Sequence, residues 1–149
     1  MLPIRRLVAS LTLCLACFAL LTPSNSLAED RPSSFITEAY YRIEWGHFDE
    51  FMELFKRNHY PILAELLKRG VIDSMEASFP VNHASEESRW DFRLRIAMSD
   101  TQAMAREMPK VSKALYPDQE KLAEEERRRF SLLKAHTDIV IRLDDMSDW

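Results

Sequence analysis

Apolar and polar residues alternate along three stretches of the chain, and a period of two is typical of a half-buried β-strand. The clearest stretch runs from Trp90 to Met98, where Phe92, Leu94 and Ile96 alternate with arginines and an aspartate. Residues 35–45 and 136–143 show the same period, and residues 71–79, between Gly70 and Pro80, also indicate a strand. We therefore expect four strands.

Between the predicted strands, apolar residues recur every three or four positions, which predicts helices. Residues 48–69 carry apolar side chains at this spacing, and Gly70 ends the pattern. Ser99 followed by Gln102 resembles a capping box and opens a second helix. The second helix stops near Pro109 or continues to Tyr116.

Pro117 and Asp118 restart the helical pattern, which then runs to about Lys134. The predicted order is β-α-β-β-α(α)-β, which defines the α+β class and a ferredoxin-like fold with a four-stranded antiparallel sheet. We assign this domain to residues 35–144, with a short lead at 29–34 and a tail at 145–149.

The first 28 residues have the order of a cleavable secretory signal peptide. Arg5 and Arg6 precede an apolar run from Leu7 to Leu21, and Ala28 completes a small-x-small cleavage site. The apolar run is about 15 residues long, whereas a transmembrane helix needs ~20. We expect cleavage after Ala28 and a periplasmic or secreted protein that does not stay in the membrane. A retained anchor is the main alternative.

Composition limits the exported part to one domain without disulfides. Both cysteines, Cys14 and Cys17, lie in the leader, so the mature chain relies on packing. Removal of the leader takes away two of the 20 basic residues and none of the 24 acidic ones, which changes the net charge from −4 to about −6. An acidic chain disfavours nucleic acids and anionic membrane surfaces as partners, and we expect neither.

The predicted sheet has one apolar face, covered by helices, and one open face that is charged. Acidic residues and arginines occur on the open face in similar number, and such a surface can pair with a copy of itself about a two-fold axis. We predict a homodimer, with a solvated sheet face as the alternative. The dimer-face residues are Arg42, Glu44, Arg93, Arg95 and Arg142, accompanied by Glu38, Glu76, Asp91 and Asp138.

The element order, together with the strand-glycine-helix entry Trp45-Gly46-His47-Phe48-Asp49-Glu50-Phe51, resembles the dimeric α/β-barrel superfamily. This superfamily includes antibiotic-biosynthesis monooxygenases, stress-responsive barrel proteins and NIPSNAP-like proteins. The resemblance covers residues 35–144 and implies protomers that pair sheet to sheet. Its haem-degrading members use an Asn, a Trp and a His, of which only Trp90 has a counterpart here, so that activity is not carried over.

The stretch Asn58-His59-Tyr60-Pro61 holds the best candidate for chemistry. His59 falls on the apolar stripe, and Pro61 cannot donate to the carbonyl of Arg57, so we expect a kink that frees backbone groups beside an imidazole. His59 is the candidate acid, base or ligand-binding group of a pocket between this helix and the sheet. The alternative is a structural histidine that satisfies the freed carbonyl. The ligand-binding candidates are Tyr41, Trp45, Asn58, Tyr60 and Trp90.

Other kinds of site lack the residues they need. The only glycines are Gly46 and Gly70, which leaves no phosphate-cradling loop or dinucleotide motif. The four histidines fall in different predicted elements, so we expect no metal site and no cofactor. Glutamates and arginines at 124–129 are spaced as helical ion pairs and predict a solvated face.

These observations favour an exported dimeric barrel that binds a small apolar or aromatic molecule. The superfamily resemblance suggests cofactor-independent oxygenation or proton transfer as its chemistry, with His59 as base. The competing hypothesis is a non-catalytic periplasmic protein that serves as an interaction or structural module.

Overall fold

The structure is a computed structural model and describes residues 34–82 and 84–146. The expected leader, residues 1–28, lies outside the described residues, as do most of the lead at 29–34 and part of the tail at 145–149. The predictions of cleavage and export are therefore not tested by the fold.

Four strands form one antiparallel sheet in the order β2-β3-β1-β4. The strands are β1 (Phe35–Ile43), β2 (Ser74–Ser78), β3 (Phe92–Met98) and β4 (Leu133–Arg142). The helices are α1 (Phe48–Leu54), the π-helical turn η1 (Phe55–His59), α2 (Tyr60–Lys68), α3 (Thr101–Leu115) and α4 (Gln119–Ser131). This order confirms the α+β, ferredoxin-like fold class.

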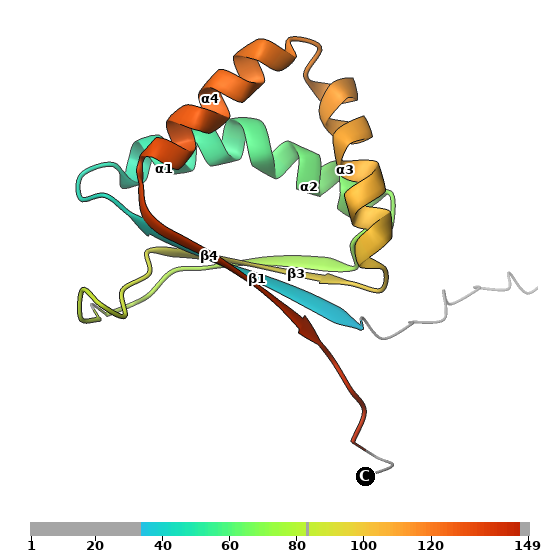
Figure 1. Cartoon of the computed structure of the whole chain (residues 1–149), viewed down its shortest axis with the longest axis horizontal. Helices are drawn as coiled ribbons and strands as arrows, with labels where there is room; N and C mark the ends of the chain where they lie inside the picture. Colours follow the sequence, from blue (N-terminus) through green and yellow to red (C-terminus); the bar gives the residue numbers. More distant parts are fainter. Residues whose placement is uncertain (1–33, 83, 147–149) are drawn as a thin grey trace, which may run out of the picture. The chain divides into compact units, whose positions relative to one another are not determined.

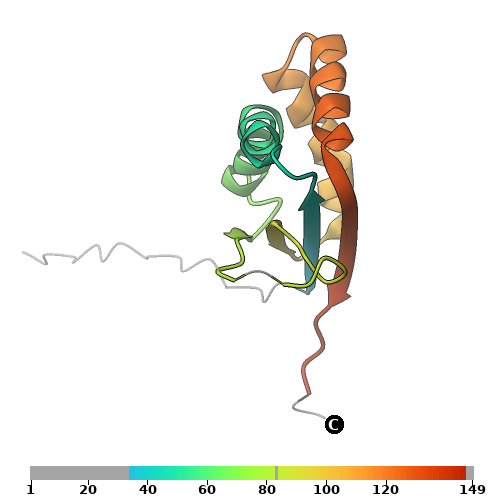
Figure 2. The same ribbon diagram turned by 90° about the vertical axis from the view of Figure 1, so that its left-hand side faces the viewer.

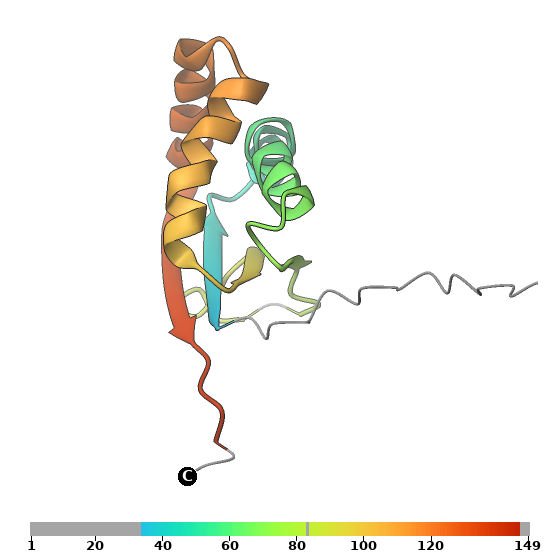
Figure 3. The same ribbon diagram turned by 90° about the vertical axis from the view of Figure 1, so that its right-hand side faces the viewer.

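All the helices lie on one side of the sheet (Figure 1). α3 packs against α2, while α4 packs against α1 and η1. Turned by 90°, the views show α1 and α2 end-on and α4 beside them, running directly into β4 (Figures 2 and 3). The edge strand β4 therefore receives its cover from α4 only near its start.

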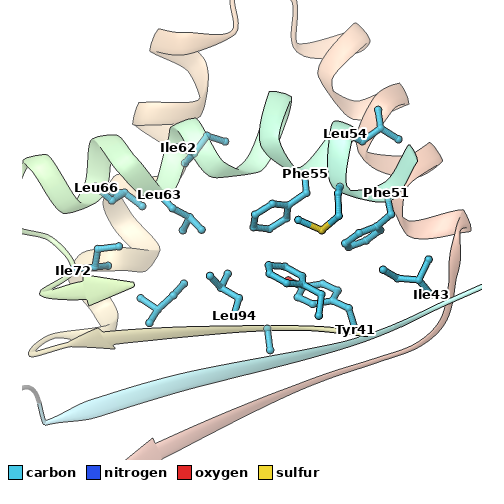
Figure 4. Close-up of a cluster of buried hydrophobic side chains, with 14 of the residues drawn as sticks. Tyr41, Ile43, Phe51, Leu54, Phe55, Ile62, Leu63, Leu66, Ile72 and Leu94 are labelled. Atoms are coloured by element: carbon cyan, nitrogen blue, oxygen red, sulfur yellow. The ribbon is translucent and has the colours of Figure 1, made fainter. Parts of the chain in front are cut away.

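The core lies between the sheet and the α1–η1–α2 segment. Phe51 and Phe55 point down from this segment toward Tyr41 and Leu94 of the sheet (Figure 4). The ring of Tyr41 lies 5.4 Å from that of Phe51 and 5.3 Å from that of Phe92. Aromatic rings at such spacings bury a large apolar area and also interact through their quadrupoles.

β1, β2 and β3 are shorter than their sequence patterns, whereas β4 begins earlier than predicted, at Leu133, because α4 ends at Ser131 and not near Lys134. β1 ends at Ile43, so Trp45 lies in the turn before α1 instead of continuing the strand. Trp90 and Asp91 precede β3, and the backbone N–H of Asp91 donates to the carbonyl of Tyr41 over 2.9 Å. Alternation thus continues beyond the ladder, because side chains near a strand end still point to alternate sides.

The N-caps of the two later helices are aspartates. The carboxylate of Asp100 accepts hydrogen bonds from the backbone N–H groups of Gln102 and Ala103, so the predicted capping role of Ser99 is wrong. Ser99 donates instead to Asp73 over 2.9 Å. α3 continues through Pro109, and Asp118 caps α4 by accepting from the N–H of Lys121, as the restart predicted.

The open face of the sheet is charged only in part. Register places Glu38, Arg93 and Arg95 on this face, where Glu38 lies 3.7 Å from Arg93 and 3.9 Å from Arg95. Arg42, also on the β1 side of this face, donates to the backbone carbonyl of Glu86 over 2.7 Å. Glu44 lies beyond the end of β1.

β4 has the opposite phase from the one predicted. Asp138 pairs with Ala39 and Arg142 with Phe35, both of which share the helix-side face, so Arg142 and Asp138 do not belong to the open face. Ile139 pairs with Glu38 and takes its place on the open face. A register shift between Arg42 and Ile43 accompanies this pairing, and a shift of one residue exchanges the two faces of a strand.

Candidate functional site

Six polar side chains gather at the α4–β4 side of the core, and we call them the polar cluster. They come from β1, η1, α4 and β4, and they are Tyr41, His59, Glu126, Arg129, His136 and Asp138. Strand register brings two of them together, because Tyr41 and His136 are direct partners on β1 and β4. Their rings stack with centroids 4.4 Å apart.

Arg129 is the most deeply buried member of the cluster, with 1% of its surface exposed. Its Nε and Nη2 donate to the two carboxylate oxygens of Glu126 over 3.2 and 2.6 Å. Its guanidinium lies 5.5 Å from the ring of Phe51 and 4.6 Å from that of Phe130. The charge is thus paired on one side and surrounded by aromatic rings on the other.

Nη1 of Arg129 is buried and has no hydrogen-bond partner among the described residues. This nitrogen carries two protons, and a buried donor without an acceptor costs about 1–3 kcal/mol. Buried Nε atoms of Arg42, Arg89 and Arg93 also lack a partner, but each carries a single proton. Arg129 therefore has the largest unmet donor capacity of these groups.

His136, which stacks on Tyr41, also has a buried nitrogen without a hydrogen bond. Its ring lies between Tyr41 and the ring of Phe130, 5.6 Å away, and its buried Nε2 lacks a hydrogen-bond partner. Oδ1 of Asp138 is 3.2 Å from Nε2, which is an ion-pair distance, but the two atoms are not aligned for a hydrogen bond. Two unbonded buried polar atoms thus belong to one cluster.

Burial sets the protonation of His59 and Tyr41. Burial lowers the pKa of His59 to about 4, and the positive charge of Arg129 adds to the effect. Burial raises the pKa of Tyr41 to about 12, although Arg129 opposes that shift. At neutral pH the imidazole and the phenol are therefore uncharged, and both are available for hydrogen bonding.

The kink expected at Pro61 is realised as the π-helical turn η1. Pro61 lies in the first turn of α2, where its missing N–H is tolerated. The freed carbonyl of Arg57 accepts a hydrogen bond from the hydroxyl of Tyr116 over 2.6 Å. Tyr116, and not His59, therefore fills the structural role that was the alternative for His59.

η1 also directs Asn58 toward α4. Asn58 is buried, and its Nδ2 donates to Glu125 over 2.8 Å. Both residues line a hollow of about 290 Å³ below the turn that joins α3 to α4, together with Tyr116. Single π turns are frequent at functional sites, where they re-aim side chains.

The structure divides the predicted site residues into separate places. Tyr41 and His59 share the polar cluster, and Asn58 faces the adjacent hollow. Trp45 and Trp90 line a different hollow near the loop between β2 and β3. Tyr60 is half exposed and lines none of these places. The binding roles of all these residues stay predictions.

The sequence reading missed Arg129 and Glu126, because it assigned residues 124–129 to a solvated face. That assignment is wrong for Arg129, which is almost fully buried. Spacing held part of the signal: Glu126 and Arg129 follow Leu122 at four and seven residues, which places the two charges on the same face of α4 as this apolar residue.

The Arg89–Asp91 pair was missed as well, and it pins the loop between β2 and β3 to the end of β1. Asp91 accepts from the N–H of Ile43 over 2.7 Å, and Nη2 of Arg89 donates to the carbonyl of Ile43 over 3.0 Å. Nη1 of Arg89 donates to both oxygens of Asp91. The pair supplies the hydrogen bonds that a continued strand would have made.

Within residues 34–82 and 84–146, no group of three or more His, Cys, Asp or Glu is placed to hold a metal ion. No helix in this part of the chain has the length and apolarity needed to cross a membrane.

The sheet order and helix layer define an α+β protein of ferredoxin-like fold. No family model matches the sequence, and no curated protein matches it either. Solved structures with the same fold do match, and they confirm the fold-level resemblance to NIPSNAP-like and dimeric ferredoxin-like proteins.

Three of these structures show the extent of the likeness. A dimeric ferredoxin-like protein from an uncultured marine organism has a TM-score of 0.54 at 7% identity, over 76% of this chain and 90% of that one. A NIPSNAP domain protein from Burkholderia xenovorans has a TM-score of 0.51 at 11% identity, over 75% and 96%. A protein from Arabidopsis thaliana has 0.51 at 12%, over 76% and 98%. Identities this low establish the fold alone.

Proposed function

We propose that this protein is exported, forms a homodimer, and binds a small aromatic molecule at the polar cluster, between the helices and the sheet. The observation that carries the proposal is that two members of the polar cluster, Arg129 through Nη1 and His136 through Nε2, have a buried polar atom without a hydrogen bond. Buried polar atoms are nearly always hydrogen-bonded in native proteins, so such exceptions need a partner. An oxygen atom of a ligand would supply it.

The surroundings define the chemical class of the ligand. The charge of Arg129 is already offset by Glu126, and His59 is neutral because burial lowers its pKa to about 4. The rings of Tyr41 and Phe130 flank His136 and offer apolar contact. An uncharged planar ring that carries a carbonyl or hydroxyl oxygen fits this environment better than an anion does.

His59 receives a hydrogen-bonding role in this proposal. General bases work best when their pKa lies near the working pH, and a pKa of about 4 makes a weak base at neutral pH. Proton transfer through His59, which the sequence suggested, therefore has less support than ligand binding.

The exposed surface of β4 supports the homodimer. β4 is an edge strand, and Ile139, Val140 and Ile141 are 45%, 62% and 37% exposed. An apolar edge strand of this length invites pairing with another chain unless it is covered. The marine protein of the same fold is described as dimeric, which favours a second copy of this chain as the cover.

Export rests on residues 1–28, whose basic start, apolar run and small residues before the cleavage point match a secretory leader. Release from the membrane after cleavage at Ala28 follows from the same pattern. N-terminal sequencing of the protein from the periplasm or the medium tests this part of the proposal, and a start near Glu29 is expected.

Two matched double variants test the ligand site. Arg129→Met with Glu126→Gln removes the buried pair, whereas Arg128→Met with Glu50→Gln removes the exposed neighbouring pair, whose bonds are 2.7 and 2.9 Å long. The protein is purified from its export compartment, and bound molecules are identified by native mass spectrometry. The wild type and the exposed-pair variant should carry the same compound, while the buried-pair variant should bind it at least about tenfold more weakly.

Equal occupancy in both variants would remove the polar cluster as the site. Far-ultraviolet circular dichroism of each variant shows whether a loss of ligand reflects unfolding. Light scattering of the mature chain should give a dimer, and a monomer would end that part of the proposal. A wild-type protein that is both empty and monomeric would favour the non-catalytic interaction module instead.

A further inference from the structure

A second hollow lies near the start of β3, at the same end of the sheet as the polar cluster but across β1 from β4. It has a volume of about 250 Å³ and is formed by the turn between β1 and α1 and by the loop between β2 and β3. Aromatic residues dominate its lining: Trp45, Phe48, Phe79 and Trp90. Trp45 is 64% exposed and Phe79 49% exposed, so large apolar surfaces face the solvent here.

Three of the aromatic side chains of the hollow make contacts with neighbouring groups. The guanidinium of Arg89 lies 4.1 Å from the centre of the Trp45 ring, a cation–π distance. Phe79 stacks on Phe92 of the core at 5.4 Å and meets Phe48 edge-on at 6.2 Å. The walls of the hollow are therefore fixed before any ligand arrives, which reduces the entropy lost on binding.

We infer that this hollow binds a neutral aromatic compound of one or two rings. A cavity of about 150 Å³ can hold benzene, so a hollow of this size accommodates a phenol-sized or indole-sized molecule but not a larger chain. Covering the exposed faces of Trp45 and Phe79 would remove apolar surface from water, which drives the binding.

The polar lining excludes a strong preference for sugars or ions. Arg89 donates to Asp91 and to the carbonyl of Ile43, and Asp91 accepts from Arg89 and from the N–H of Ile43. Their charges offset each other and their hydrogen-bonding atoms are largely occupied. A sugar needs many such partners, and apart from this pair Asn82 is the one described lining side chain with an amide or charge.

This site is distinct from the ligand site of the proposed function. Its lining includes none of the polar cluster residues, and Arg129 and Arg89 are on different elements with different partners. Failure of one site therefore leaves the other intact.

Tryptophan fluorescence offers a direct test, because two of the three tryptophans line the hollow. In a Trp149→Phe chain, excitation at the red edge reports on Trp45 and Trp90 during titration with p-cresol. We expect a saturable change in emission with a Kd of about 0.1–1 mM, typical of a ligand with so few atoms. Neither 4-methylcyclohexanol, which has the same size without the aromatic ring, nor maltose should saturate at these concentrations.

Phe79→Ala should weaken p-cresol binding about fivefold, as the loss of one aromatic partner does. Leu143→Ala is the matched control, because Leu143 is 47% exposed and lies outside the hollow. Trp45→Ala, read through Trp90, gives a second variant at an exposed position that should fold normally and also bind more weakly. A linear response to p-cresol, or one affinity for all three variants, would overturn the inference.

Discussion

Two arginines are buried in the described part of the chain, and they differ in how their guanidinium groups are satisfied. Arg89 donates through Nη1 to both oxygens of Asp91 and through Nη2 to the carbonyl of Ile43, while its Nε lies 3.0 Å from Glu86. Arg129 bonds to Glu126 and lies close to the hydroxyl of Tyr41, while its Nη1 makes no hydrogen bond of good geometry. The guanidinium of Arg89 links the loop between β2 and β3 to the end of β1, whereas the guanidinium of Arg129 keeps a donor nitrogen without a hydrogen bond.

The difference shows that burial of a charge does not reveal its role. Arg89, whose two terminal nitrogens are both bonded, stabilises the fold while its partners stay and has little hydrogen-bonding capacity left for a ligand. An arginine with an open donor weakens the fold unless something completes it, which is the usual situation at binding sites. The hydrogen bonds of the two guanidinium groups therefore distinguish the Arg89 region from the Arg129 region better than the exposed fractions of their side chains do.

Loss of Arg89 should have the largest effect on stability. Arg89→Met leaves Asp91 without its positively charged partner and the Ile43 carbonyl without its side-chain donor, and we expect the free energy of unfolding in urea to fall by about 3 kcal/mol. Arg69→Met, which removes an exposed pair with Glu65 at 2.9 Å, is the control and should cost no more than about 1 kcal/mol. Similar losses for the two variants would contradict the structural role of Arg89.

Acid should weaken the polar cluster through His59. The pKa of His59 is lowered from 6.5 to about 4 in the folded protein, so between these values the unfolded chain binds a proton that the folded chain does not. Stability is therefore full above pH 6.5 and falls as the pH drops toward 4, by up to about 3 kcal/mol. Urea unfolding of the wild type and of His59→Gln from pH 7 to pH 4 measures this. His47→Gln, which changes an exposed histidine, is the control and should keep the pH dependence of the unfolding free energy. If His59→Gln kept this pH dependence and His47→Gln removed it, the effect would not belong to His59.

Tyr116 tests the π turn that positions His59 and Asn58. Tyr116→Phe removes the hydroxyl that donates to the carbonyl of Arg57, and the free energy of unfolding should fall by about 1 kcal/mol. Hydrogen exchange of the amides of residues 55–62 should rise at the same time. An increase spread over the whole sheet would indicate a global effect instead.

The smallest change in stability is expected for the buried pair of the polar cluster. Arg129→Met with Glu126→Gln removes both charges together, and replacement of a buried pair by groups of similar volume is neutral to within about 1 kcal/mol or stabilising. Calorimetric melting without ligand measures it. A loss of stability as large as that caused by Arg89→Met would show that Arg129 and Arg89 both stabilise the fold.

The elements that have a long, regular pattern were predictable from sequence. Alternation in β3 and the three- and four-residue spacing of α1 and α2 reflect burial against the core, which is strong enough to dominate local preferences. β4 was predicted as a strand with its faces exchanged. Its isoleucines lie on the open face, and a strand that is little covered on either side carries no pattern that fixes its phase.

The polar cluster could be predicted only in part. The sequence predicted His59 and Tyr41 as site residues because each is a polar residue on an apolar face of its element, and the two lie in one region of the fold. Arg129 and Glu126 were hidden in a run of six charged residues whose helical spacing suits solvent equally well. Which member of such a run turns inward depends on how α4 packs on η1, and that is a tertiary property.

The reversed phase of β4 has a thermodynamic consequence for self-association. Because isoleucines replace charged residues along this side of the open face, a dimer formed there would bury apolar surface, and its formation would have a negative heat-capacity change. Cooling should then loosen the dimer, whereas added salt should affect it little. The fraction of protein that is dimeric should therefore depend on the temperature at which it is kept.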